Sequence, residues 1–358
     1  MFGRSLNERR RLARRAGRAH RSAVMIGAAA ICWAATCPAQ TPSPNPAVKL
    51  AQNWDLVEPI SPVPADISLD PARVSLGERL FRDSRLSVDD TRSCATCHPV
   101  EKGAMDGHAR GIAVDGRPRL RNTPTLFNVG LNTSFNWDGA TSTLEAHAER
   151  LLLNLDVMGS TWPALLAKLQ ADPGYRSAFS SAYPQGITQA NLLNALATFE
   201  RSLVTPNARF DRFLRGETKA LTAEERQGYE LFKSYGCIAC HQGVNIGGNL
   251  FQKFGIFQDP DAQRGSKTDV DVGRYAVTKV ERDRGVFRVP SLRNVALSAP
   301  YFHDGRMPTL EGAVETMARV QLGRALTGQE IGAIVRFLHT LTGEYRNQHS
   351  TIAAPGTP

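Results

Sequence analysis

The sequence predicts a mainly α-helical protein with two domains of the same kind. Apolar residues recur at helical spacing in several segments of both halves, and stretches rich in Gly, Asn and Pro separate these segments. The motif Cys-x-x-Cys-His occurs once in each half, at residues 94–98 and 237–241. A chain of 358 residues is long enough for two domains, each with a core of its own.

Residues 1–39 have the composition of a secretory signal peptide. Eight arginines and one acid precede the apolar run 22–35, and small residues follow it. The run is short for a membrane span, so we expect cleavage near Ala39 and export to the periplasm, with an uncleaved anchor as the alternative. This segment holds +7 of the formal charge of +9 and leaves +2. The mature chain therefore has no charge signature of a nucleic-acid partner, and no stable membrane insertion is expected.

The rest of the chain divides by composition and periodicity. Residues 40–69 are a proline-rich lead-in, with order expected to begin near Asp70. The expected domains cover residues 70–205 and 206–345, and residues 346–358 form a flexible tail. A polar hinge at 206–219 is expected to join the two domains.

Helices are expected before and after each Cys-x-x-Cys-His motif. Val74, Leu76, Leu80 and Phe81 give one apolar face to a helix that ends before the first motif. Similar patterns predict helices at 143–155, 162–171, 188–203, 222–235, 310–320 and 327–341. Thr222 precedes two glutamates, which is typical of a helix N-terminus. The glycine-rich segments 100–135 and 242–290 are expected to be loops, ordered by cofactors rather than by strand pairing.

Each Cys-x-x-Cys-His motif is a complete site for covalent attachment of haem c. Two thiols form thioethers with the porphyrin, and the adjacent His98 or His241 binds the iron from the proximal side. The histidine must follow at once, so that one helical turn presents all three groups to one ring. The predicted attachment residues are Cys94, Cys97, Cys237 and Cys240.

Other uses of these cysteines fit the sequence less well. A zinc ribbon needs its two cysteine pairs close together, whereas Cys97 and Cys237 lie in different halves of the chain. A thioredoxin-like pair needs a surrounding βαβ pattern, which the sequence lacks. Cys32 and Cys37 belong to the signal segment, so no cysteine remains for a disulfide.

Further segments resemble the bacterial di-haem cytochrome c peroxidases and occur in the order typical of that family. The resemblance covers about residues 70–343 and rests on 76–81, 121–125, 137–139, 210–216, 243–250, 289–297 and 301–305. It implies two cytochrome c-like domains, each with one covalent haem. It also implies hydrogen peroxide as substrate, a small cytochrome c or cupredoxin as electron donor, and compatibility with a homodimer. The same superfamily contains di-haem enzymes that oxidise tryptophan residues of partner proteins.

The resemblance assigns different roles to the two haems. The haem on His241 would be the high-potential haem where electrons enter, with Met317 as its second ligand, because thioether ligation raises the potential. Met307 is the second choice, and the alternative is that Met317 is an ordinary core residue of its helix. The haem on His98 would be the low-potential haem that reacts with peroxide. Trp137 matches the tryptophan that lies between the two haems in this family.

The resemblance also implies a calcium site between the domains. Its ligands would be Asn122 and the backbone carbonyls of Ser298 and Pro300. A set of neutral oxygen ligands completed by waters is chemically suited to Ca²⁺.

The chain departs from the family pattern at the first haem. Val114 stands where the family has a releasable histidine ligand, and a valine cannot bind iron. Two histidines are candidates for the sixth position: His108 in the same loop, and His147 in the helix after Trp137.

A second departure concerns proton transfer. The glutamate that helps to cleave peroxide in this family is replaced by Val157, with Asp156 next to it. Cleavage of the O–O bond needs a group that moves a proton between the two oxygens, so either His147 or Asp156 takes that task, or peroxide is not the main substrate.

Three functional hypotheses follow. The leading one is a periplasmic di-haem peroxidase. The second is an electron-transfer or redox-sensing protein in which both irons are six-coordinate, with His147 bound to the first. The third is oxidation of a partner protein, which Met317 disfavours because relatives of that kind have Tyr as the ligand.

Overall fold

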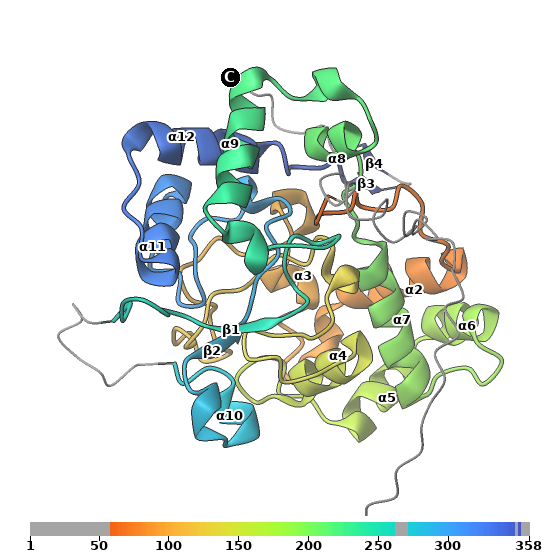
Figure 1. Cartoon of the computed structure of the whole chain (residues 1–358). Helices are drawn as coiled ribbons and strands as arrows, with labels where there is room; N and C mark the ends of the chain where they lie inside the picture. Colours follow the sequence, from red (N-terminus) through yellow and green to blue (C-terminus); the bar gives the residue numbers. More distant parts are fainter. Residues whose placement is uncertain (1–57, 262–270, 348–349, 352–358) are drawn as a thin grey trace, which may run out of the picture. The chain divides into compact units, whose positions relative to one another are not determined.

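The computed structural model describes residues 58–261, 271–347 and 350–351 (Figure 1). The predicted signal peptide, most of the proline-rich lead-in and most of the C-terminal tail lie outside these residues. The described residues belong to one compact unit. Within the described part of the chain, no helix has the length and hydropathy that a membrane span requires.

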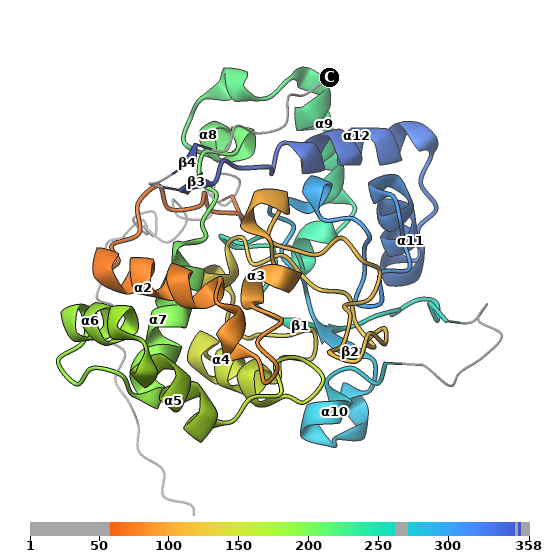
Figure 2. The same cartoon turned by 180° about the vertical axis from the view of Figure 1, so that it is seen from behind.

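The described residues are mainly helical, which confirms the predicted fold class (Figures 1 and 2). Strands β1 (Phe251–Lys253) and β2 (Val286–Arg288) pair antiparallel, as do β3 (Arg346–Asn347) and β4 (Ser350–Thr351). The α-helices are α2 (Pro71–Phe81), α3 (Cys94–Cys97), α4 (Leu144–Leu153), α5 (Trp162–Ala171), α6 (Pro173–Ala182), α7 (Gln189–Ser202), α8 (Arg209–Leu214), α9 (Ala223–Ser234), α10 (Tyr275–Thr278), α11 (Leu310–Leu322) and α12 (Gly328–His339).

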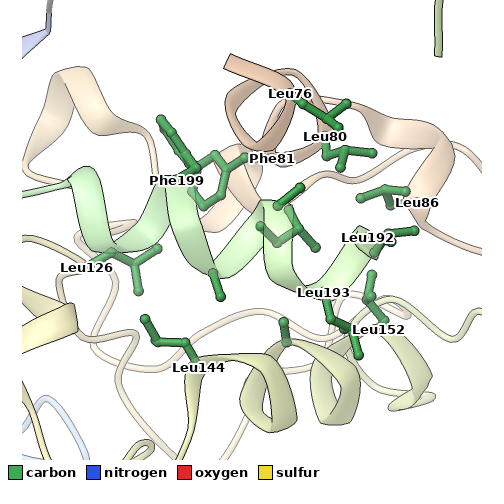
Figure 3. Close-up of a cluster of buried hydrophobic side chains, with 14 of the residues drawn as sticks. Leu76, Leu80, Phe81, Leu86, Leu126, Leu144, Leu152, Leu192, Leu193 and Phe199 are labelled. Carbon is green, nitrogen blue, oxygen red and sulfur yellow. The ribbon is translucent and has the colours of Figure 1, made fainter. Parts of the chain in front are cut away.

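The helices divide into two groups, each with its own hydrophobic core. Helices α2, α4, α5, α6 and α7 surround the first core, whose buried residues lie between Leu76 and Leu203 (Figure 3). Helices α9, α11 and α12 surround the second core, which includes Tyr229, Phe232 and Phe337. The two groups lie apart in Figures 1 and 2.

The two cores use the same packing device. In α2, Gly77 lies against the backbone of α7, where a Cβ atom would clash with the carbonyl oxygen of Ala195. In α9, Gly228 lies in the same way against the carbonyl oxygen of Ala333 in α12. Both glycines are therefore needed for a close helix crossing. Each is followed four residues later by a buried phenylalanine of the core, Phe81 or Phe232.

The start of α2 follows from its sequence. Asp70 accepts hydrogen bonds from the backbone N–H groups of Ala72 and Arg73, and Pro71 occupies the first helical position. In α9, Thr222 is the N-cap, as predicted, and it also forms a reciprocal capping box with Glu225.

The prediction that residues 206–219 form a polar, solvent-exposed hinge is wrong, because part of this segment is buried. This segment contains α8, and both Phe210 and Asp211 are fully buried. Asp211 is paired there with Arg293, at 2.7 Å between Oδ1 and Nη1. A buried ion pair across 80 residues of sequence has no local pattern, which is why the segment looked like a solvated linker.

Two further expectations differ from the structure. Order begins before Asp70, because Ile60 and Val63 are buried and Val63 N–H donates to Asp211. The glycine-rich segment 242–290 contains the β1–β2 hairpin, so strand pairing orders part of it. Helix α6 also was not predicted, although Asp172 caps it and Pro173 begins it.

Candidate functional site

The first Cys-x-x-Cys-His motif forms one short helical turn. Cys94 and Cys97 are the ends of α3, and the N–H of His98 donates to the carbonyl of Cys94 at 2.9 Å. The Nδ1 atom of His98 lies 3.0 Å from the carbonyl oxygen of Ala104. This hydrogen bond selects the tautomer that leaves the Nε2 lone pair free for iron. Burial also lowers the pKa of His98 and so favours the neutral imidazole that ligation requires.

The second motif has the same geometry on a tighter turn. Residues Cys237–Ala239 form a 3₁₀ turn after Gly236, whose φ is +95°. The N–H of His241 donates to the carbonyl of Cys237 at 3.0 Å, and its Nδ1 lies 3.3 Å from the oxygen of Ile246. Burial lowers the pKa of His241 to about 4. Both motifs therefore present two thiols and one neutral imidazole, which fits haem c.

The other uses of cysteine find no support among the described residues. All four motif cysteines are free thiols, so none is in a disulfide. No group of three or more His, Cys, Asp or Glu side chains in the described ranges is arranged to hold a metal ion. Burial raises the pKa of Cys94 to about 12 and that of Cys237 to about 11, so these are not activated thiolates.

A mostly apolar cavity lies over the second motif. Cys237, Cys240 and His241 line it, and Met317 of α11 lines it as well. An apolar cavity with two thiols and a neutral imidazole in its wall is suited to a porphyrin. Met307, the second choice as ligand, is not among the lining residues and contacts the first turn of α11 at Gly312.

Trp137 lies in the wall of the same cavity and is held by both halves of the chain. Its indole Nε1 donates to the carbonyl of Asn122 at 3.0 Å, and its own carbonyl accepts the N–H of Arg288 at 2.8 Å. The side chain is buried, and its ring meets His303 edge-on with the centroids 6.3 Å apart. Its position is therefore fixed by hydrogen bonds as well as by packing.

The three residues expected to bind calcium line the same cavity. Asn122 comes from a segment far in sequence from the one that holds Ser298 and Pro300. The side-chain Nδ2 of Asn122 donates to the carbonyl of His108 at 2.8 Å, which leaves its Oδ1 as the acceptor that would face a cation. Neutral oxygen donors of this kind fit Ca²⁺.

The two candidate histidines for the first haem have different environments. His108 is exposed, whereas the ring of His147 lies at 6.0 Å from that of Phe135 and its Nδ1 atom is buried without a hydrogen-bond partner. Burial is the main cause that lowers the pKa of His147, to about 4. Of the two candidates, His147 is therefore the partly buried one, and its imidazole is neutral at pH 7.

The remaining departures from the family pattern lie together. The N–H of Val114 donates to the carbonyl of Asp156 at 3.2 Å, so the two loops are adjacent. The Asp156 side chain is 63% exposed and pairs with Arg117 at 3.5 Å. Val157 is partly buried against the first core. Of the candidates for proton transfer, His147 is partly buried with its Nδ1 fully buried, whereas Asp156 faces solvent.

Several buried charges were not predicted from the sequence. Glu200 of α7 is buried with its Oε2 unpaired, and Arg288 of β2 is buried with its Nη1 unpaired. Arg121 forms ion pairs with Asp138 and Asp271 beside Trp137. Only the adjacency of Asp138 to Trp137 could have indicated one of these, because burial of a charge has no signature in a single sequence.

Comparison with known proteins agrees with this geometry. A sequence model of the family described as di-haem cytochrome c peroxidase matches residues 71–219. The cytochrome c peroxidase Ccp of Escherichia coli is 44% identical over 289 residues, which are 80% of this chain but only 62% of that relative. The cytochrome c551 peroxidase of Nitrosomonas europaea is 39% identical over 288 residues, 80% of this chain and 85% of the relative.

Solved structures agree as well. The crystal structure of a MauG-like protein associated with microbial copper homeostasis has a TM-score of 0.68 and 32% identity, covering 82% of this chain and 96% of that one. The similarity thus extends over both Cys-x-x-Cys-His motifs and both cores. The chain belongs to the di-haem cytochrome c peroxidase family.

Proposed function

We propose that this protein is a periplasmic peroxidase that reduces hydrogen peroxide to two waters, using two electrons from a small cytochrome c or cupredoxin and two protons. Membership of the family implies two haem c groups. The observation that carries the proposal is the pair of haem-attachment motifs, each with a neutral histidine whose Nδ1 is fixed by a backbone carbonyl. Trp137, held by its indole hydrogen bond, is the proposed relay between the two haems. The exported location rests on the composition of residues 1–39.

The second site is suited to receiving electrons. Its cavity is mostly apolar, and His241 and Met317 both line it. Ligation by a histidine and a thioether raises the reduction potential of a haem. Trp137 then supplies an aromatic ring on the way to the first site. Its two hydrogen bonds keep that ring in one orientation, so the spacing of the relay stays constant.

The first site is suited to peroxide chemistry at which His147 handles the proton. The haem bound there supplies the redox chemistry that splits the O–O bond. His147, kept neutral by burial, can accept a proton from one peroxide oxygen and return it to the other. Its unpaired, buried Nδ1 is the described atom available for a hydrogen bond on this side.

The test is steady-state oxidation of a reduced small cytochrome c or cupredoxin by hydrogen peroxide, with the purified di-haem protein. We expect turnover that depends on both peroxide and donor. No turnover after the second haem has been reduced beforehand would contradict the proposal.

A second candidate function is electron transfer or redox sensing without turnover. It is favoured by Val157 in place of the usual glutamate and by His147, a candidate ligand for the sixth position of the first haem. Electron paramagnetic resonance separates the two, because an iron with two protein ligands is low-spin. A high-spin ferric signal from the first haem favours the peroxidase.

Oxidation of a partner protein is the third candidate function, and the similarity to a MauG-like structure is the observation that supports it. Met317 in the wall of the second cavity argues against it, because the relatives with that activity carry a tyrosine ligand.

Calcium binding is proposed as a structural feature of the same protein. Asn122, Ser298 and Pro300 would supply the oxygen ligands between the halves. Chelation with EGTA should then lower activity, and added Ca²⁺ should restore it.

A further inference from the structure

Arg288 is the last residue of β2 and lines the second haem cavity together with Trp137. Only 5% of it is exposed. Its backbone N–H donates to the carbonyl of Trp137 at 2.8 Å, and its Nε donates to the carbonyl of Asn136 at 3.2 Å. Arg288 lines the cavity together with His241 and Met317. Its guanidinium is therefore held by the Trp137 segment on one side and reaches the cavity on the other.

The charge of Arg288 has no counterion in the described part of the chain. Its Nη1 is buried and has no hydrogen-bond partner, and no described carboxylate lies within ion-pair distance of it. The other buried arginines differ, since Arg293 pairs with Asp211 at 2.7 Å and Arg121 pairs with Asp138 at 2.6 Å. Burial is accordingly the cause that lowers the pKa of Arg288, to about 10.

An unpaired buried cation is costly, so such a residue is expected to meet an anion that the polypeptide does not provide. A haem has two propionate carboxylates, which are its anionic groups. A guanidinium N–H directed at a carboxylate forms a short, charge-assisted hydrogen bond. The unpaired Nη1 of Arg288 has the position and the charge for such a bond.

We propose that Arg288 binds a propionate of the haem attached at Cys237 and Cys240, and so raises the reduction potential of that haem. The positive charge near the iron favours the reduced form, which carries one positive charge less. The inference depends on the presence of haem, which family membership implies, and not on peroxidase activity. The same short strand would thus fix the Trp137 backbone and one edge of the electron-receiving haem.

The test is a spectroelectrochemical titration of the haem-loaded Arg288→Gln variant, with Arg282→Gln as the matched control. Arg282 lies six residues away, is exposed, and carries the same charge. We expect the reduction equilibrium constant of the second haem to fall about tenfold in Arg288→Gln, which is about 59 mV for one electron. Arg282→Gln and the first haem should change less than twofold.

If Arg288→Gln binds haem poorly, the proposal can be tested with a second variant, Arg288→Lys. In Arg288→Lys the charge remains, but the planar donor pair is lost. We expect a shifted propionate bending mode in its resonance Raman spectrum, and a second-haem potential that varies with pH as the released propionate titrates. An unaltered Raman mode and a pH-independent potential in Arg288→Lys would overturn the proposal. So would a potential change confined to the first haem, which would assign the propionate to that haem instead.

Discussion

The two haem sites are alike on the side of the proximal histidine and different on the opposite side. In both, a Cys-x-x-Cys-His turn follows a helix that crosses its neighbour at a glycine, Gly77 or Gly228. In both, the histidine Nδ1 is fixed by a backbone carbonyl. On the other side, Met317 lines the second cavity, and His147 is the residue proposed for the corresponding place at the first site.

The difference teaches that attachment and function are separable in this fold. The proximal half needs only local geometry, so it recurs in both domains. The opposite half depends on residues from distant helices, α4 for the first site and α11 for the second. Substitution of one residue on that side should change the role of the haem without disturbing its covalent attachment. The predictions below test this separation, from the largest expected effect to the smallest.

His147→Ala should have the largest effect, and that effect should be confined to the first haem site. If His147 moves the proton at the first site, its removal should lower kcat/KM for peroxide by about 10²- to 10⁴-fold. The second haem should keep its spectrum and potential. His108→Ala is the matched control, because His108 is exposed in the structure, and it should stay within twofold. Equal activity of both variants would remove His147 from the mechanism.

Glu200→Gln tests the buried carboxyl group of α7, whose Oε2 has no hydrogen-bond partner. Burial raises the pKa of Glu200 to about 8, from an ordinary value of 4.5. The folded protein therefore holds this proton more tightly than the unfolded chain, so its stability is greatest below pH 4.5 and falls as pH rises towards 8. Between pH 5 and 8 this loss of unfolding free energy is roughly 3 kcal/mol, and it should be absent in Glu200→Gln.

The measurement is chemical unfolding of the haem-loaded protein at both pH values. The exposed Glu315→Gln in the second domain serves as the control and should keep the pH dependence of the unaltered chain. An unchanged pH dependence in Glu200→Gln would show that Glu200 is ionised in the folded state.

Gly77→Ala and Gly228→Ala test whether the two domains are equivalent in packing. Each new methyl group would meet a backbone oxygen of the partner helix. Each variant should lose about 1–3 kcal/mol of unfolding free energy. Hydrogen exchange should show the loss in α2 and α7 for the first, and in α9 and α12 for the second. A loss spread evenly over both helix groups would mean that the cores do not open separately.

Met317→Leu sharpens the comparison on the side of the second haem. Loss of the thioether should lower the potential of that haem by about 59 mV or more, a tenfold change in its reduction equilibrium. Met307→Leu is the control, because Met307 is not in the cavity wall. The reverse result, a shift with Met307→Leu alone, would exchange their roles.

Asp156→Asn should have the smallest effect. Its carboxylate is exposed and paired with Arg117 across 3.5 Å, and such a pair contributes little. Peroxidase activity should stay within twofold, measured as kcat/KM for peroxide. A loss as large as that in His147→Ala would make Asp156 the group that moves the proton.

Much of the fold was predictable because its signals are local. The bounds of α5 follow the predicted 162–171, and those of α7 and α9 differ by one residue at each end. The short helix α8 was missed because its burial depends on Arg293, which comes much later in the chain. The β1–β2 hairpin was missed for a similar reason, since 32 residues separate Lys253 from Val286.

The sequence by itself determined the two haem-attachment sites, because each motif holds its whole chemistry within five consecutive residues. Only the tertiary structure decided which other residues share their cavities. It placed Met317, and not Met307, in the wall of the cavity that His241 lines, gave His147 rather than Asp156 a buried ring nitrogen, and left Nη1 of Arg288 without a partner in that cavity. Those choices depend on burial and on contacts between distant segments, which the order of residues along the chain does not encode locally.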